Sequence, residues 1–287
     1  MTSIIKNFFS GEKAINSFFL NLIGAQSVRY IITKSLYWIK INFFNTNKLL
    51  SLKYKKLIDD GLQIKENFLS EQEFNNIFLE YEKLINDKRF VVIEKQSVTE
   101  VERGIDLKYA YVSDKLKEDY PFLFNLKNNR DIRDFFEYAE QKKNINIQCR
   151  LERIEITSNE LPDTNKDYHY DTYYNTFKCW LFIKDVESSM GPFRFVCKSH
   201  LFNLKRLFLE WINSVKYSVN NSVNTSFRDS EINKKYNDSI SQEITVKKNS
   251  LVMANTHGLH RRGDGVVGSV RFGIQFWTRE NPFKIFK

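Results

Sequence analysis

Cysteine, histidine and long apolar runs are scarce in this sequence, and their scarcity excludes several classes of protein. The 287 residues include three cysteines, Cys149, Cys179 and Cys197, with no C-x-x-C spacing. An odd number of cysteines without that spacing argues against a disulfide framework and against a structural zinc site. All three lie in apolar or alternating segments, where a free cysteine behaves as a small hydrophobe. A reducing cytoplasm is therefore the expected location.

No apolar run has the length of a membrane-spanning helix. The longest uncharged run extends from Ala14 to Val28, and polar residues interrupt it. A spanning helix needs roughly 20 apolar residues. The N-terminal segment also lacks the small-residue cleavage site of a signal peptide. We expect neither a transmembrane helix nor a secretory leader.

Motifs for nucleotide and nucleic-acid binding find no support. There is no P-loop and no nucleophile elbow, and the G-x-G-x-x-G match at residues 263–268 leads into a predicted strand rather than opening a helix. The net charge is +9 at pH 7, but the basic residues are scattered in short pairs rather than gathered in a stripe. We therefore expect no nucleic-acid partner. The positive balance still favours anionic partners, such as an acidic membrane surface or a small acid substrate.

Aromatic and aliphatic residues are abundant enough for a packed catalytic domain. Hydrophobic residues make up 42% of the chain, with 25 Phe and 14 Tyr. Single all-β domains of roughly 200–250 residues are common. We expect a helical N-terminal extension over residues 1–58 and one domain over residues 59–287. Within it, residues 216–243 are rich in Asn, Ser and charge and predict a lid or a long surface loop.

One helix of the N-terminal extension has two open interpretations. Apolar residues recur at helical spacing between Val28 and Phe44, with basic residues between them. Such a helix either packs on its own domain or lies in a membrane interface with Trp38 at headgroup level. Peripheral membrane contact through residues 14–44 is thus one alternative.

The rest of the chain predicts a β structure with flanking helices. Ser70 and Glu73 form a capping box, and residues 145–153 alternate cleanly between apolar and polar. Short strands separated by frequent turns indicate a sandwich or barrel rather than a parallel α/β sheet. We expect strands near 62–65, 145–153, 169–173, 176–183, 244–246, 251–254 and 270–277, and helices near 71–86, 130–142 and 201–215.

Two of the four histidines belong to a spaced set that suits a metal. His169 and Asp171 stand at i and i+2, so a strand projects them from one face. His260 lies far downstream in a Gly- and Arg-rich turn, and Arg271 follows on the last predicted strand. Two imidazoles and a carboxylate form the facial triad of non-haem iron(II). An H-x-D triplet alone is also frequent by chance. His200 has no partner at metal-binding spacing and is expected to be structural, at a helix start.

Together these segments resemble the phytanoyl-CoA dioxygenase family of iron(II)/2-oxoglutarate oxygenases. The similarity spans roughly residues 58–283, and the text that carries it is His169-Tyr170-Asp171-Thr172, residues 178–182, residues 191–200 and residues 254–263, with Arg271. The resemblance implies a mainly β (α+β) fold: a double-stranded β-helix, or cupin-like jelly roll, with flanking helices.

The resemblance also implies roles for individual residues. His169, Asp171 and His260 would bind iron(II), and Arg271 would bind the C5 carboxylate of 2-oxoglutarate, which a guanidinium fork matches with two hydrogen bonds. Lys178 and Trp180 are weaker candidates for lining the 2-oxoglutarate pocket. His257 would be a neighbour of the ligands.

The implied reaction is hydroxylation of an unactivated C–H bond in a small molecule, lipid or glycoconjugate. Molecular oxygen is consumed and 2-oxoglutarate is decarboxylated to succinate, with ascorbate as a candidate reductant. Because Asp171 is present, chloride has no vacated ligand position, so hydroxylation is favoured over halogenation. Two alternatives stay open: a non-catalytic jelly-roll module that binds glycan or lipid, and a desaturase or cyclase that uses the same site.

Overall fold

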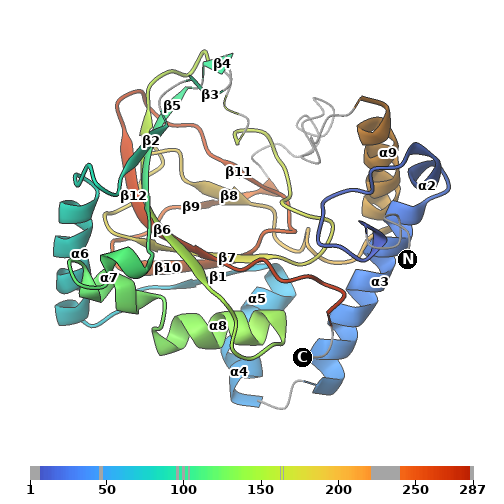
Figure 1. Cartoon of the computed structure of the whole chain (residues 1–287), viewed down its shortest axis with the longest axis horizontal. Coiled ribbons are helices and arrows are strands. Elements are labelled where there is room, and N and C mark those ends of the chain that lie inside the picture. The colour runs from blue at the N-terminus through green and yellow to red at the C-terminus, as the bar shows by residue number, and fades with distance from the viewer. Residues whose placement is uncertain are drawn as a thin grey trace.

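The computed structural model describes residues 7–44, 48–94, 97–98, 101–102, 104–161, 163, 165–220 and 240–284. Residues 221–239, most of the predicted lid, lie outside the described residues. The main element is a seven-stranded antiparallel sheet in the order β1-β10-β7-β12-β6-β5-β2 (Figure 1). Its strands are β1 (Leu62–Lys65), β2 (Val92–Glu94), β5 (Ile105–Tyr111), β6 (Gln148–Ile156), β7 (Phe177–Phe182), β10 (Ser250–Asn255) and β12 (Val270–Trp277).

A smaller sheet completes the β structure. It has three strands in the order β11-β8-β9, with β8 at Phe193–Phe195, β9 at Gln242–Ile244 and β11 at His260–Arg262. Isolated bridges such as that between His169 and His260 continue its pairing. A separate hairpin pairs β3 (Ser97–Val98) with β4 (Val101–Glu102). Buried apolar side chains from both sheets form one cluster, so the sheets pack face to face as in a jelly roll.

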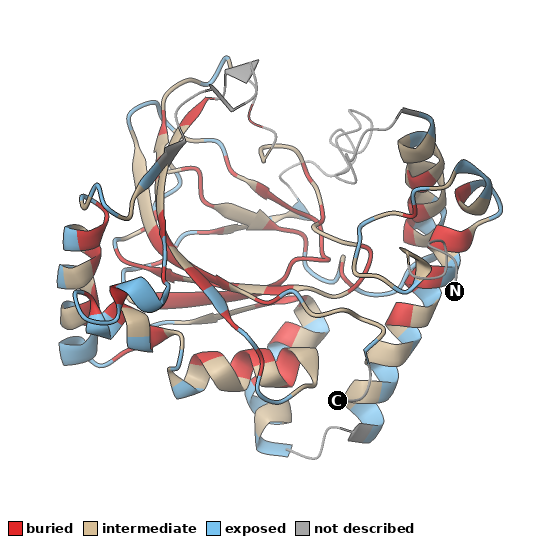
Figure 2. Cartoon of the chain, viewed as in Figure 1, coloured by how far each residue is buried: buried red, intermediate tan, exposed pale blue. Residues whose placement is uncertain are grey.

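Helices cover the outer face of the large sheet. Apolar side chains of four helices share one buried core with alternate residues of the strands, among them Cys149, Cys179 and Leu181 (Figures 1 and 2). The residues between them project to the inner face, as strand alternation requires. The expected jelly roll with helices on one sheet is thus confirmed. These helices are α5 (Lys55–Asp60), α6 (Glu71–Leu84), α7 (Pro121–Leu126) and α8 (Arg130–Glu140), and η2 (Asp114–Leu116) is a short 3-10 turn.

Helices α2 (Phe18–Leu22), α3 (Ala25–Ile39) and α9 (Leu204–Asn220) form a second group at one side of the molecule (Figure 1). Helices α2 and α3 both pack against α9. A π-helical turn, η1 (Lys40–Phe44), extends α3, and α4 (Lys48–Lys53) follows. Among the described residues, no helix combines the length and apolarity that crossing a bilayer requires.

The buried face of α3 is not its apolar stripe. Arg29, Tyr30 and Thr33 are buried, whereas Ile31 and Trp38 are exposed. Helix α3 does pack on its own domain, against α9, but Val28, Ile31 and Ile39 of the apolar stripe stay exposed. The helix docks instead through polar and aromatic groups, because Arg29 and Gln26 donate hydrogen bonds to the backbone of residues 10–13.

Several element boundaries differ from the predicted ones. Helix α9 begins at Leu204 rather than near residue 201, because the Asn203 side chain accepts from Lys205 N and Arg206 N and caps it there. The predicted strand at residues 169–173 is reduced to the single bridge at His169. The capping box at Ser70 and Glu73 is present and starts α6 as predicted.

Candidate metal centre

Backbone pairing brings the two candidate histidine ligands together. His169 N donates to His260 O and His260 N donates to His169 O, each at 2.9 Å. Asp171 N donates to Thr256 O at 3.0 Å, in the turn that precedes β11. An H-x-D segment thus lies beside a histidine far along the chain. The sequence showed that His169 and Asp171 stand two residues apart, but it could not show that His169 pairs with His260.

The side chains of His169, Asp171 and His260 converge on one point. One ligand atom from each residue lies within 4.8 Å of the others, and the two imidazole centroids are 4.4 Å apart. His260 Nε2 lies 3.9 Å from Asp171 Oδ1. Two imidazoles and one carboxylate at these separations are the donor set of a facial triad.

The hydrogen bonds of both imidazoles suit metal binding. His169 Nδ1 lies 2.8 Å from Asp167 O, and His260 Nδ1 lies 2.8 Å from Gly258 O. A carbonyl oxygen can only accept, so each neutral ring carries its proton on Nδ1 and its lone pair on Nε2. Metal-ligating histidines are usually oriented in this way. Burial, together with the nearby His169, lowers the pKa of His260 to about 3, which keeps its lone pair available.

Asp171 is held as a carboxylate. Burial alone would raise its pKa, but the Lys178 ammonium and the His260 ring lower it well below its usual range. Lys178 Nζ lies 2.8 Å from Asp171 Oδ2. Lys178 therefore contacts a candidate metal ligand directly, in addition to lining the cavity as predicted.

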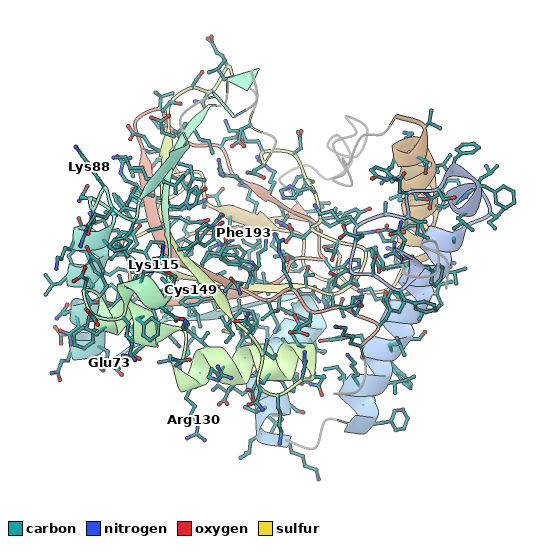
Figure 3. All side chains as sticks on the ribbon, in the orientation of Figure 1. Glu73, Lys88, Lys115, Arg130, Cys149 and Phe193 are labelled. Atoms are coloured by element: carbon teal, nitrogen blue, oxygen red, sulfur yellow. The ribbon has the colours of Figure 1, made fainter. Side chains whose placement is uncertain are left out.

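The triad opens into a cavity of about 230 Å³ between the two sheets. Arg271, Lys178 and Trp180 line this cavity together with the triad. Phe193, which lies in the interior of the molecule in Figure 3, packs between Trp180 and His260, with ring centroids 5.0 and 5.5 Å away. The lining of the cavity therefore combines aromatic rings with the cations Lys178 and Arg271.

Arg271 is the cavity cation best suited to an incoming carboxylate. It donates to Gly191 O, and among the described residues it has no ion-pair partner. Arg262, which lines the same cavity, is by contrast paired with Asp163 at 2.7 Å. Burial and the nearby Arg262 lower the pKa of Arg271 to about 10, so it remains a cation at neutral pH.

The cavity contains polar residues that were not among the predicted site residues. Arg150 and Glu152 on β6 form an ion pair of 2.5 Å, and Gln275 on β12 stands beside them. The sequence could have indicated these residues, because they alternate with the apolar residues from which the strands were predicted. Asn165 and Arg261 come from loop and edge positions and carried no such signal.

The two remaining histidines lie outside the cluster. His257 is buried, and its Nδ1 donates to Thr172 O at 2.8 Å, next to Asp171. Burial, with Lys34 and Arg206 nearby, lowers its pKa well below the usual value. His200 Nε2 contacts Ile58 O at 2.9 Å within a turn, not at a helix start.

Gly61 explains how His200 fits. Gly61 has a φ of +82° and ends α5, and a Cβ on it would lie 2.5 Å from His200 Nδ1. A side chain here would clash with the imidazole as well as strain the backbone. His200 is thus enclosed by the junction of α5 and β1, and it is not part of the candidate metal cluster.

The fold and the cluster together define a jelly-roll protein with a two-histidine, one-carboxylate centre. Solved structures share the fold. The α-ketoglutarate-dependent epimerase SnoN from nogalamycin biosynthesis, in complex with Fe³⁺, α-ketoglutarate and nogalamycin RO, aligns with a TM-score of 0.55 at 12% identity over 80% of this chain and 82% of that chain. EctD from S. alaskensis, in its apoform, aligns with a TM-score of 0.51 at 12% identity over 81% and 80%.

These likenesses establish the double-stranded β-helix fold. No protein-family model matches the sequence, and no curated protein matches it either. The resemblance to the phytanoyl-CoA dioxygenase family therefore stays a prediction, while membership of the wider jelly-roll architecture is confirmed.

Proposed function

We propose that the protein is an iron(II)/2-oxoglutarate-dependent oxygenase that hydroxylates a C–H bond of a small molecule, lipid or glycoconjugate. His169, Asp171 and His260 would hold the metal. Arg271 would bind the distal carboxylate of 2-oxoglutarate, and Trp180 would form a wall of its pocket. Bound iron(II) supplies the oxidising chemistry, while the chain orients the co-substrate and excludes water.

One observation carries this proposal: a metal donor set and an arginine with no ion-pair partner among the described residues line the same cavity. Arg271 is half-buried, and a partly desolvated guanidinium without an ion-pair partner is stabilised when a ligand supplies an anion. The cavity is also the right size for a small dicarboxylate rather than for a whole drug-sized ligand, at about 230 Å³.

The outcome of the oxidation is a separate question. SnoN is an epimerase that was solved in complex with nogalamycin RO, so one fold serves outcomes other than hydroxylation. The carboxylate ligand Asp171 favours hydroxylation over halogenation, because it leaves chloride no vacated ligand position. Product mass separates the outcomes: hydroxylation adds one oxygen, desaturation or ring closure removes two hydrogens, and epimerisation leaves the mass unchanged.

The test is anaerobic reconstitution with iron(II), followed by addition of 2-oxoglutarate and oxygen. We expect one equivalent of bound iron and slow formation of succinate even without substrate. Lack of iron binding together with lack of succinate would favour the alternative, a non-catalytic jelly-roll module that binds glycan or lipid. Ascorbate in half of the reactions tests its proposed role as reductant.

We also propose a cytoplasmic location with peripheral contact to an anionic membrane through residues 14–44. Support comes from exposed apolar side chains on α2, α3 and η1, including Phe19, Trp38 and Phe43 at 66%, 59% and 69% exposure, and from the net charge of +9.

Flotation with phosphatidylglycerol vesicles tests this contact. We expect the protein to float with the vesicles and a Phe19→Ser, Trp38→Ser double variant to lose most of this binding. Leu79→Ser is the matched control, because Leu79 is equally exposed, at 66%, on α6 of the other helix group. Failure of the unmodified protein to float would contradict the proposal.

A further inference from the structure

A second, larger cavity adjoins the candidate metal centre. It measures about 660 Å³, and Arg150, Asp171, Lys178 and Gln275 line both cavities. The two spaces therefore meet at the candidate ligand Asp171. The first is the size of a small co-substrate, whereas the second falls in the usual range for a drug-sized ligand, roughly 300–1,000 Å³.

The walls of this second cavity come from both ends of the described chain. Residues 11–14 form one wall, residues 277–281 form another, and Tyr217 of α9 adds to them. Residues 172–177, which follow Asp171 in the chain, contribute Thr172, Tyr174, Thr176 and Phe177. The N-terminal extension thus contributes directly to a space beside the candidate metal centre.

The N-terminal wall is fixed in place rather than loosely apposed. Arg29, fully buried on α3, donates to Ser10 O at 3.0 Å and to Glu12 O at 2.9 Å. Gln26 Nε2 donates to Lys13 O at 3.0 Å, and Tyr174 Oη donates to Gly11 O at 3.3 Å. The buried Arg29 guanidinium thus binds two backbone carbonyl groups, and with Gln26 and Tyr174 it fixes residues 10–13 in place.

The chemistry of the walls indicates what the cavity takes. Tyr111, Trp277 and Tyr174 contribute aromatic rings to the lining, and polar groups of both signs line the cavity with them, including Glu12 and Arg279. Aromatic faces contact the C–H surfaces of a ring, and adjacent donors and acceptors match hydroxyl groups, which both donate and accept. An acyl chain would bury these polar groups without partners.

We propose that the second cavity is the substrate site of the oxygenase and that its substrate is a polyhydroxylated ring compound of the sugar type. This inference rests on the proposed function and selects the polar, glycan-like members of its substrate range over lipid. The N-terminal segment at residues 11–14 is part of the substrate site, and the oxidised C–H bond is the one presented to Asp171.

Binding is tested on metal-free protein, so that the result does not depend on turnover. The probes are lactose, maltose, sucrose and N,N′-diacetylchitobiose, with sodium dodecanoate as the contrasting apolar ligand, and the measurement is saturation-transfer NMR. We expect at least one disaccharide to bind with a Kd in the millimolar range or below. Binding of dodecanoate alone, or of none of the probes, overturns the inference.

Two variants locate the binding. Trp277→Ala removes an aromatic face and should weaken disaccharide binding by about fivefold to tenfold. Ala14→Trp fills the cavity from the N-terminal wall and should abolish binding without removing any contact, which keeps the test valid if Trp277→Ala misfolds. Trp38→Ala is the control, because Trp38 lies exposed on α3. Undiminished binding in a folded Ala14→Trp variant overturns the assignment to this cavity.

The binding experiment can fail independently of the test of the proposed oxygenase function. Succinate formation without any disaccharide binding leaves the oxygenase proposal standing and overturns the substrate class. Disaccharide binding without iron binding or succinate formation overturns the oxygenase proposal and, with it, the substrate role of the cavity.

Discussion

Single residues determine whether the cluster can hold a metal. Each histidine has its Nδ1 held by a carbonyl oxygen, so loss of one ring removes one fixed donor and leaves the others unchanged. We predict that His169→Ala and Asp171→Ala each abolish stoichiometric iron binding and succinate formation. Iron content after anaerobic desalting and succinate yield are the two measurements.

His200→Asn is the matched control for these variants. His200 is also a buried histidine, but its ring contacts Ile58 O and stands outside the cluster. We expect this variant to retain iron binding with a lower unfolding temperature. If His169→Ala retained full iron stoichiometry, the ligand assignment would be wrong.

Arg271 offers a separate test of the co-substrate site. Hydrogen bonds to a charged group contribute roughly 1.5–3 kcal/mol each, so Arg271→Ala should raise the KM for 2-oxoglutarate by about 10- to 100-fold. Arg262→Lys should change it much less, because Arg262 is already paired with Asp163. An unchanged KM in Arg271→Ala would place the carboxylate elsewhere.

Strand alternation in the sequence predicted the cavity residues that lie on strands. It did not predict the cavity residues that tertiary contacts bring in from irregular segments. Lys178, Trp180 and Arg271 were expected inside and do line the cavity, because each stands on a strand with one apolar face. Asn165 lies in an irregular segment, and its approach depends on a backbone contact from Arg262 N at 2.6 Å. No local pattern encodes such a contact.

At the scale of elements, the strands were easier to predict than the N-terminal helices. Strand β6 buries Cys149 and Leu151, as its alternation indicated, but it extends from Gln148 to Ile156 and also buries Ile154 and Ile156 on its other face, which packs toward the second sheet. Helix α3 packs on its own domain with an unexpected face, because its buried face carries Arg29 and Gln26 and its apolar stripe is exposed. Helical periodicity finds the stripe but does not identify what covers it.

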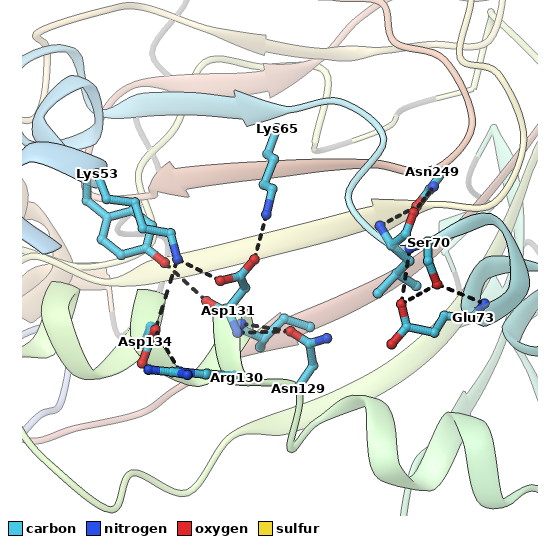
Figure 4. Close-up of polar contacts among 12 residues, drawn as sticks. Lys53, Lys65, Ser70, Glu73, Asn129, Arg130, Asp131, Asp134 and Asn249 are labelled. Atoms are coloured by element: carbon cyan, nitrogen blue, oxygen red, sulfur yellow. Dashed lines mark hydrogen bonds and ion pairs between the residues drawn. The ribbon is translucent and has the colours of Figure 1, made fainter. Parts of the chain in front are cut away.

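Asp131 links three elements and provides a test of their packing. At the start of α8, which Asn129 caps, its carboxylate accepts from Lys53 Nζ on α4 at 2.6 Å and from Lys65 Nζ on β1 at 2.5 Å (Figure 4). Hydrogen bonds from Lys53 and Lys65 lower the pKa of Asp131. Because the folded pKa is depressed, this contribution is present above the unfolded value and is lost as the pH falls through the folded one.

We therefore predict that Asp131→Asn lowers the free energy of unfolding by about 1 kcal/mol or less at pH 7, after allowance for solvent screening of a partly exposed pair. The difference from the unmodified protein should shrink as the pH falls below about 4. Urea unfolding at both pH values measures it. Asp59→Asn is the control, since its pair with Lys55 is exposed and lies within one helix. A difference that does not depend on pH would show that the ion pairs are not its source.

For the whole molecule, both ends of the chain lie on the side of α3 (Figure 1). The rings of Phe8 and Phe9 pack against Phe283 with centroids 6.3 and 5.2 Å apart, and Asn281 donates to Phe9 O at 3.0 Å. Contacts between residues so distant in sequence leave no local signal. The predicted division at residue 58 stays a prediction, but the wall that residues 11–14 add to the second cavity depends on this meeting of the two ends.

Ligand binding should stabilise the whole molecule in a defined order. A ligand at 100 times its Kd adds about 2.7 kcal/mol to the free energy of unfolding, and each kcal/mol raises the Tm by roughly 2–4 °C in chains of 150–250 residues. We predict that anaerobic iron(II) raises the Tm and that 2-oxoglutarate adds a further rise only when the metal is present, because its pocket adjoins the triad. Arg271→Ala should retain the first rise and lose most of the second, whereas His169→Ala should lose both. An equal response of the two variants to 2-oxoglutarate would mean that the metal and the arginine do not bind one co-substrate together.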